Sequence, residues 1–205
     1  MNAIQKRQLA SLIYVTPEYL ELSVRPTVVA ILQKSEKVKH LSGDQKKKYL
    51  EKHHAANLGL MFKHGASSTA DVTVCVHEQD DFDCVLKLVH ATKGVAYKPV
   101  QLKQVPYNVN GHADIQTEIN KLKKYTSSSE LMVAFWINRD VKFDLRDLDF
   151  DGLGIEQLYF LGVKPSGVVT LHGGPVPDLV SGVCWTRIAS NGTLETKPVR
   201  FKPKL

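Results

Sequence analysis

The sequence predicts an α/β protein in which helices flank a mixed sheet. Three observations carry this prediction: a stripe of apolar residues at helical spacing within 42–65, an alternation of apolar and polar residues over 71–105, and a nearly unbroken apolar run at 131–137. A second helical pattern lies between the last two. The predicted core therefore runs helix, three-strand meander, helix, strand, and a C-terminal β extension follows it.

Length and composition place this core in one domain. The chain has 205 residues, of which 43% are hydrophobic and 23% charged, so neither a disordered nor a collagen-like class fits. A chain of this length buries enough surface to fold without a metal or a disulfide. We expect a single domain over 1–205, with the core at about 42–138, an N-terminal helical segment at 1–41 and the extension at about 150–205.

Charge and cysteine content narrow the class further. The net charge of +6 weakly favours a polyanionic partner. Cys75, Cys84 and Cys184 form no C-x-x-C pair, which favours a reduced intracellular protein. The sequence has no run of about 18 apolar residues, which a membrane span would need. The N-terminal residues lack the pattern of a signal peptide. We therefore expect a cytoplasmic protein with no membrane partner.

Capping residues mark the first helices. Thr16 precedes a proline and is typical of a helix start, whereas Pro26 is expected to separate that helix from the next piece. Ser42 followed by Gln45 fits a capping box, and Gly65 fits a C-terminal cap. A helix is therefore predicted between them.

The apolar stripe of that helix leads to a carboxylate. Ala55, Leu58 and Phe62 share one face, and four residues back the same face reaches Glu51. A carboxylate on a buried stripe is costly unless something binds it. Alternatively, Glu51 lies in the exposed first turns, where the helix dipole favours an acid. The sequence leaves both readings open.

Three strands are predicted over residues 71–105. Apolar and polar residues alternate in 71–78 and again in 82–89, and an acidic turn separates the two runs. A turn at 92–94 then leads into a third strand at 95–105. Their succession predicts a β-meander.

A second helix and a buried strand complete the core. Ile115, Ile119 and Leu122 recur at helical spacing, and three lysines lie near the end of that helix. Residues 131–137 (LMVAFWI) predict a strand that is covered on both faces. Further strands are predicted at 168–171, 182–189 and 193–201, the last two flanking an Asn191-Gly192 hairpin turn.

Polar residues with metal-binding chemistry fall on this core. Gln101 and Lys103 are two residues apart on the third strand, so they project from the same face. If the second and third strands pair, Asp83 meets them across the sheet, with Glu51 overhead on the helix. Carboxylate and carbonyl oxygens are the ligands that Mg²⁺ prefers.

These residues, in this order of elements, resemble the PD-(D/E)xK nucleases, the restriction-endonuclease-like superfamily. The resemblance is to the Gln-variant (D…QxK) branch, as in Mrr-like and related defence-associated nucleases. That family's core runs helix with Glu, strand, strand with Asp, strand with (E/Q)-x-K, helix, strand. The counterparts here are Glu51 in EKHHAANLGLMF, Asp83 in FDCVLKL, and Gln101 and Lys103 in VQLKQV, all within about 42–138.

The resemblance implies a metal-dependent endonuclease that hydrolyses phosphodiester bonds of DNA, in a defence or mobile-element setting, with Mg²⁺ or Mn²⁺ as cofactor. Asp83, the Gln101 side-chain oxygen and the Leu102 backbone carbonyl would hold the ion. Lys103 would position the attacking water and stabilise charge on the phosphate. Glu51 would orient the ion's outer waters or hold a second ion.

The resemblance also implies that lysines outside the site contact the nucleic-acid backbone, giving salt-dependent binding without sequence information. These are Lys46, Lys47, Lys48, Lys121, Lys123 and Lys124. A solvated helix face explains the same lysines without a partner. DNA is the expected partner, with RNA and a homodimer left open.

Two departures from the family pattern keep an alternative open. Phe82 stands where the family has proline, and Gln101 stands where it more often has an acid, so the site has one negative charge fewer. Both departures also fit an inactive nucleic-acid- or protein-binding module of the same fold. Taken singly, Asp83 fits the end of an acidic turn, and Gln101 and Lys103 fit the solvated face of an antiparallel strand.

Overall fold

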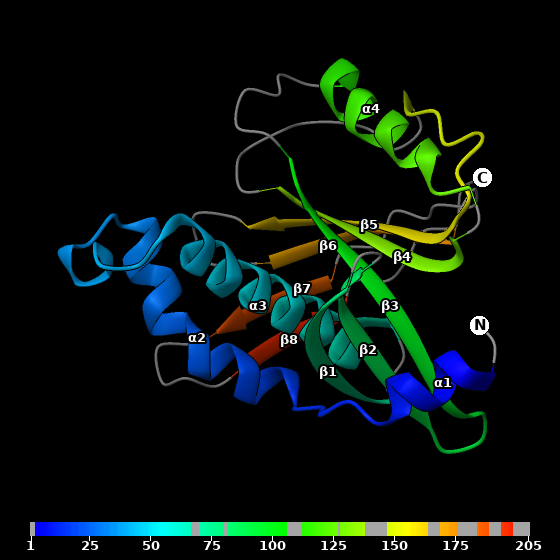
Figure 1. The fold of residues 1–205 in the computed structure, drawn as a ribbon, viewed down its shortest axis with the longest axis horizontal. Coiled ribbons are helices and arrows are strands. Elements are labelled where there is room, and N and C mark those ends of the chain that lie inside the picture. The colour runs from blue at the N-terminus through cyan, green and yellow to red at the C-terminus, as the bar shows by residue number, and fades with distance from the viewer. Residues whose placement is uncertain are drawn as a thin grey trace. The chain divides into compact units, whose positions relative to one another are not determined.

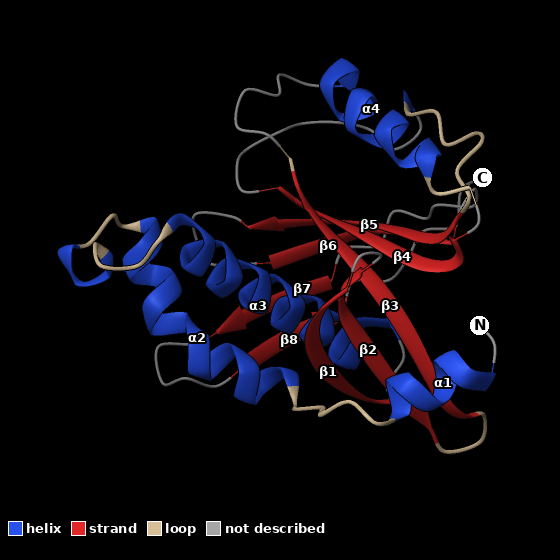
Figure 2. Cartoon of the chain, viewed as in Figure 1, coloured by secondary structure: helices blue, strands red, loops and turns tan. Residues whose placement is uncertain are grey.

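The computed structural model describes residues 3–66, 70–79, 82–105, 112–126, 128–137, 147–163, 169–175, 184–188 and 194–198. The chain divides into two compact units, Met1–Tyr97 and Lys98–Leu205, whose elements are drawn in Figures 1 and 2. Among the helices in these ranges, none is long and apolar enough to cross a membrane.

The first unit consists of helices followed by strands. Its elements are α1 (Ala3–Ala10), α2 (Pro17–Leu32), the 3-10 turn η1 (Glu36–Val38), α3 (Gly43–Met61), the π-helical turn η2 (Phe62–Ala66), β1 (Ala70–Gln79), β2 (Phe82–His90) and the beginning of β3 (Gly94–Gln104). Helices α2 and α3 lie side by side as a helical hairpin with η1 at its closed end (Figure 1).

The predicted helix starts are confirmed. The hydroxyl of Thr16 accepts a hydrogen bond from the backbone N–H of Tyr19 at the start of α2. At the start of α3, Ser42 Oγ accepts from the Gln45 backbone at 3.2 Å, and Gln45 Oε1 accepts from the Ser42 backbone at 2.8 Å. These two bonds form the capping box that the sequence indicates.

Two predicted helix boundaries are wrong. Pro26 lies inside α2 rather than between two helices, because Val24 and Val28 on either side of it are buried on one face and hold the helix together. Gly65 does not cap α3, which ends at Met61 and leads directly into the π-helical turn that contains this glycine.

Helix α3 packs closely on the antiparallel pair β1–β2. The register places Val74 opposite Leu86 and Val76 opposite Cys84, and all of these except Val76 are almost fully buried. At Gly59 the helix comes so near to β1 that an added Cβ would lie 2.6 Å from Val74 Cγ2. The core of this unit therefore lies between α3 and one face of β1–β2.

The second unit contains a mixed sheet, as the α/β prediction requires. Strand β3 pairs in parallel with β4, β4 in parallel with β5, and the remaining strands follow as antiparallel neighbours. Its other elements are α4 (His112–Asn120), the 3-10 turn η3 (Lys121–Lys124), β4 (Ser128–Ile137), β5 (Ile155–Val163), β6 (Val169–Pro175), β7 (Cys184–Ile188) and β8 (Leu194–Pro198).

The centre of this sheet was predicted only in part. Leu131–Ile137 of β4 is entirely buried, which confirms a strand covered on both faces. Strand β5 was not anticipated, although Phe160 on it stacks on Phe135 of β4 with ring centroids 5.6 Å apart. Strands β7 and β8 form the predicted antiparallel pair, while the Asn191-Gly192 turn lies outside the described residues.

Candidate functional site

Glu51 lies in the third turn of α3 on the side that is mostly buried. Its side chain is only 15% exposed, and Lys47, one turn earlier, places its Nζ 3.3 Å from the Glu51 carboxylate. Helix α3 begins at Gly43, so Glu51 is well inside the helix. Glu51 is therefore not an exposed first-turn acid but a largely buried carboxylate that has a lysine partner.

Asp83 is the second residue of β2 and is partly buried. It belongs to the strand itself, so it does not end the acidic turn. The next residue, Cys84, is fully buried, and burial raises the pKa of its thiol. The carboxylate of Asp83, coupling to the Cys75 thiol, and the carboxylate of Glu51 raise that pKa further.

The effect of Glu51 on Cys84 shows which part of β2 lies near this helical carboxylate. Cys84 is the third residue of β2, and a charge on α3 can shift its pKa only from nearby. Glu51 of α3 therefore lies close to the beginning of β2, where Asp83 is. Alternation along β2 puts Cys84 on the face that α3 covers and Asp83 on the other face. Glu51 and Asp83 thus belong to one unit, on different faces of β2.

Gln101, Leu102 and Lys103 are consecutive on β3, in the part that belongs to the second unit. Gln101 is buried at 9% exposure, whereas Leu102 and Lys103 are partly buried. In the parallel ladder with β4, Gln101 lies opposite Val133 and Lys103 opposite Phe135. A solvated antiparallel face is therefore wrong for Gln101. Alternation along the strand keeps Gln101 and Lys103 on one face.

The oxygen donors of this set suit a hard divalent cation. They comprise two carboxylates, one amide oxygen and one backbone carbonyl, which is the chemistry that Mg²⁺ and Mn²⁺ accept. Within the described part of the chain, no three His, Cys, Asp or Glu side chains are grouped as a metal site. In the predicted set, only Glu51 and Asp83 belong to these four residue types. Binding of a metal ion by this set would therefore also need the amide oxygen of Gln101 and the carbonyl oxygen of Leu102.

Helices α2 and α3 enclose a polar cluster that the sequence does not reveal. Glu21 of α2 is 3% exposed, and its Oε2 lies 2.7 Å from His53 Nδ1 and 3.3 Å from Asn57 Nδ2. Asn57 Nδ2 also donates to the His53 carbonyl at 2.8 Å. The Asn57 side-chain amide thus donates both of its hydrogens to oxygen atoms. Because a carboxylate oxygen accepts, the short contact between Glu21 Oε2 and His53 Nδ1 is a hydrogen bond donated by the His53 Nδ1–H.

His54, next to this cluster, is buried and neutral. Burial holds its pKa well below the ordinary value of 6.5, and the nearby His53 lowers it further. The two imidazole rings lie 6.0 Å apart. The sequence predicts helix α3, which carries His53 and Asn57. It does not predict the cluster, because nothing in the local pattern shows that Glu21, on another helix, faces α3.

The predicted backbone-contacting lysines lie in two places. Lys46, Lys47 and Lys48 occupy the first turns of α3. The other three form η3, where Lys121 is paired with Glu118, Lys123 Nζ lies 3.7 Å from Asp149, and Lys124 lies over the Tyr125 ring. Lys46 is partly buried, and the other five are exposed.

Two comparisons with known proteins gave no relative. No protein-family model matches the chain, and no curated protein matches it. The fold and the arrangement of these side chains are therefore the basis on which a function is proposed.

Proposed function

We propose that this protein is a metal-dependent endonuclease of the restriction-endonuclease-like superfamily that hydrolyses phosphodiester bonds in DNA. The observation that carries the proposal is a largely buried carboxylate, Glu51, inside α3 and an aspartate, Asp83, on β2 of the same unit. The order α3, β1, β2, β3, α4, β4 supports it, because the resemblance requires a helix with Glu before a strand with Asp.

Each residue has a role that its chemistry allows. A bound Mg²⁺ or Mn²⁺ would polarise the scissile phosphate and lower the pKa of a bound water. Asp83, the Gln101 oxygen and the Leu102 carbonyl would hold that ion. Glu51 would orient water at the site. The Lys103 ammonium would hold the attacking water and stabilise charge on the phosphate oxygens.

Isosteric substitutions test this proposal. Asp83→Asn and Lys103→Met remove one charge each and preserve side-chain size. Cleavage of circular and linear DNA, and of RNA, is measured with Mg²⁺ or Mn²⁺. We expect the wild type to cut DNA and both variants to lose at least about 100-fold in rate, a typical loss when a charge-stabilising group is removed.

Matched controls separate chemistry from folding. Asp71→Asn lies at an exposed position of β1 and Lys93→Met in the exposed turn after β2, and both should cut at the wild-type rate. Cleavage that survives Asp83→Asn and Lys103→Met, or no cleavage by the wild type on any substrate, would contradict the proposal. The second result would favour an inactive binding module of the same fold.

A further inference from the structure

The connection between α2 and α3 concentrates positive charge. Residues 34–48 contain six lysines and two acids, a net charge of +4 in a chain whose total is +6. We call the six lysines the basic tip: Lys34, Lys37, Lys39, Lys46, Lys47 and Lys48.

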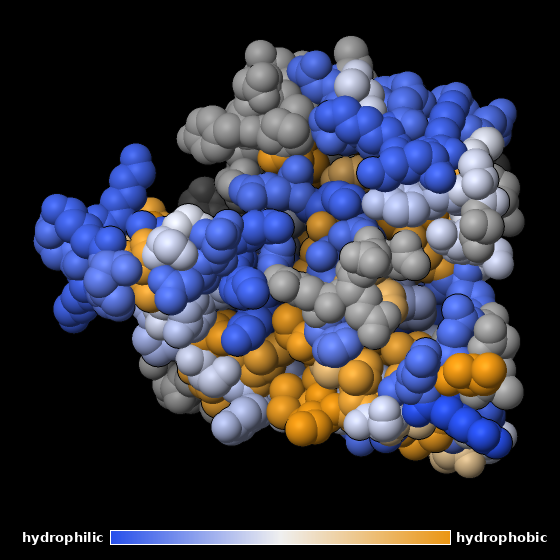
Figure 3. All heavy atoms as spheres, in the orientation of Figure 1, coloured by the Kyte–Doolittle hydropathy of each residue, from blue (hydrophilic) through white to orange (hydrophobic). Residues whose placement is uncertain are grey.

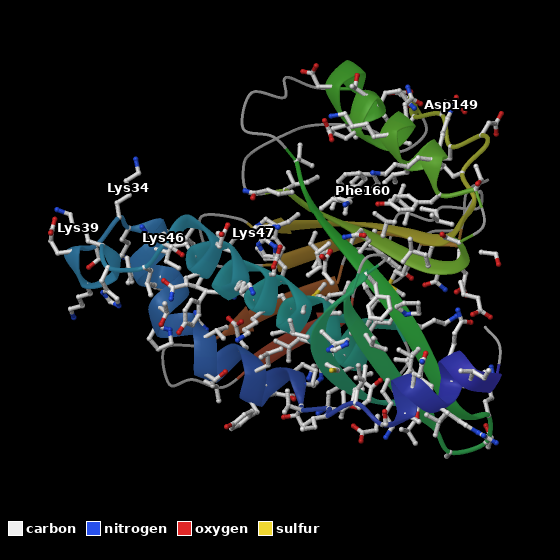
Figure 4. All side chains as sticks on the ribbon, in the orientation of Figure 1. Lys34, Lys39, Lys46, Lys47, Asp149 and Phe160 are labelled. Carbon is white, nitrogen blue, oxygen red and sulfur yellow. The ribbon has the colours of Figure 1, made fainter. Side chains whose placement is uncertain are left out.

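The basic tip forms one end of the helical hairpin within the first unit. Figure 4 labels Lys34, Lys39, Lys46 and Lys47, which lie from the turn around η1 into the beginning of α3. Figure 3 shows this end as mostly hydrophilic surface. The side chains of Lys39 and Lys47 are 70% and 74% exposed.

Local acids neutralise the tip only weakly. Glu36 pairs with Lys39 at 2.7 Å, and both side chains are highly exposed. Lys47 pairs with Glu51 at 3.3 Å. The Glu36–Lys39 pair is exposed on both sides, and such pairs contribute little and are screened by salt, so a polyanion can replace it.

Lys34 shows that charge is kept at a cost in stability. Its φ of 52° is left-handed, and the bonds from Lys34 N–H to Ile31 O and from Ser35 N–H to Ala30 O form a Schellman motif at the end of α2. Glycine is the favoured residue at that position because it has no Cβ. A lysine there gives up conformational stability and presents an ammonium to solvent.

We propose that the basic tip binds the phosphate backbone of duplex DNA, an inference that rests on the proposed nuclease function and names the surface that holds its substrate. The lysines are spread over a turn and two sides of a helix, which suits an extended polyanion better than a single small anion. Residues 34–48 contain no arginine and no Phe, Tyr or Trp. With His40 as its one ring and no large aromatic side chain to stack on exposed bases, the tip favours a duplex over a single strand.

Binding is tested apart from cleavage, in EDTA with the Asp83→Asn protein. Fluorescence anisotropy with a labelled DNA duplex gives the affinity at several salt concentrations. In the tip variant, Lys34, Lys37 and Lys39 are each changed to Gln. We expect the salt slope to fall by about 3 and the affinity at about 0.1 M salt by on the order of 100-fold, since each lost phosphate contact removes about 0.9 from the slope.

The matched control removes the same charge elsewhere in the first unit. Lys6, Arg7 and Lys93, all exposed, are changed to Gln and should leave the slope unchanged. Equal losses in both variants, an unchanged slope in the tip variant, tighter binding to single strands, or no duplex binding by the Asp83→Asn protein would each overturn the inference. Duplex binding that depends on the tip, in a protein that never cuts, would support the inference and contradict the proposed activity.

Discussion

His53 of α3 and Glu21 of α2 are joined by a 2.7 Å hydrogen bond inside the helical hairpin. The Glu21 carboxylate also accepts from Asn57, so one buried acid satisfies two side chains of the neighbouring helix. A buried polar group of this kind is stable only while its partners are present. The cluster therefore fixes how α2 and α3 pack on each other.

Glu21→Ala should lower the free energy of unfolding by about 3 kcal/mol, because His53 and Asn57 are left with unsatisfied donors. Glu21→Gln keeps one acceptor oxygen and should cost less. Urea unfolding measures both. The control Glu36→Ala removes an exposed acid of the same charge and should change stability by no more than about 0.5 kcal/mol. Equal losses for Glu21→Ala and Glu36→Ala would contradict a buried role for Glu21.

His54 should make the protein less stable in acid. The pKa of His54 in the folded protein is well below the ordinary 6.5. Below pH 6.5 the unfolded chain therefore binds a proton at His54 that the folded protein excludes. Stability is then complete above pH 6.5 and falls as the pH drops, by up to about 1.4 kcal/mol per pH unit. Urea unfolding between neutral and acidic pH measures the slope.

His54→Asn should reduce that dependence on pH, whereas His40→Asn, at an exposed position, should leave it unchanged. If His54→Asn and the wild type lose stability in parallel as the pH falls, another group is responsible.

Gly59→Ala should be destabilising despite the higher helix propensity of alanine. The added methyl group would lie 2.6 Å from Val74 Cγ2 and 2.8 Å from Pro17 Cγ. Overpacking of this kind costs roughly 1–3 kcal/mol. Gly43→Ala, in the first turn of the same helix with no atom within 4 Å of the new Cβ, should be neutral or stabilising. Thermal unfolding of both variants decides the matter, and a stabilised Gly59→Ala would refute the close packing of α3 on β1.

Lys34→Gly should raise stability by about 1 kcal/mol, because glycine adopts the left-handed conformation without strain. Lys37→Gly removes the same charge from η1, at a residue whose φ is not positive, and should lower stability by roughly 0.5–1 kcal/mol. Chemical unfolding compares the two. A loss of stability in both variants would show that position 34 carries no strain.

Local chemistry made part of this fold predictable. The Ser42 and Gln45 pair needs only neighbouring residues, and it marks the start of α3 correctly. The alternation in β1 and β2 and the apolar run of β4 likewise act over a few residues, and those strands were found within three residues of their observed ends.

Features that depend on distant residues were not predictable. Pro26 stays in α2 because packing of its neighbours outweighs one missing hydrogen bond. Strand β5 is defined by a parallel neighbour, β4, and its sequence IEQLYFLGV has no clear alternation. For the candidate site, the sequence named Glu51 but could not decide whether it was buried, since that depends on where α3 meets β2. Glu21 was missed because its partners are more than thirty residues away.

Strand β3 belongs to both units, because the boundary falls between Tyr97 and Lys98, inside Gly94–Gln104. Domain boundaries usually fall in an exposed loop that tolerates proteolysis and insertion. Here a gene split at the boundary would leave each fragment with part of a strand. Any fragment of this protein that is meant to keep the pairing of β3 with β4 therefore has to carry β3 whole.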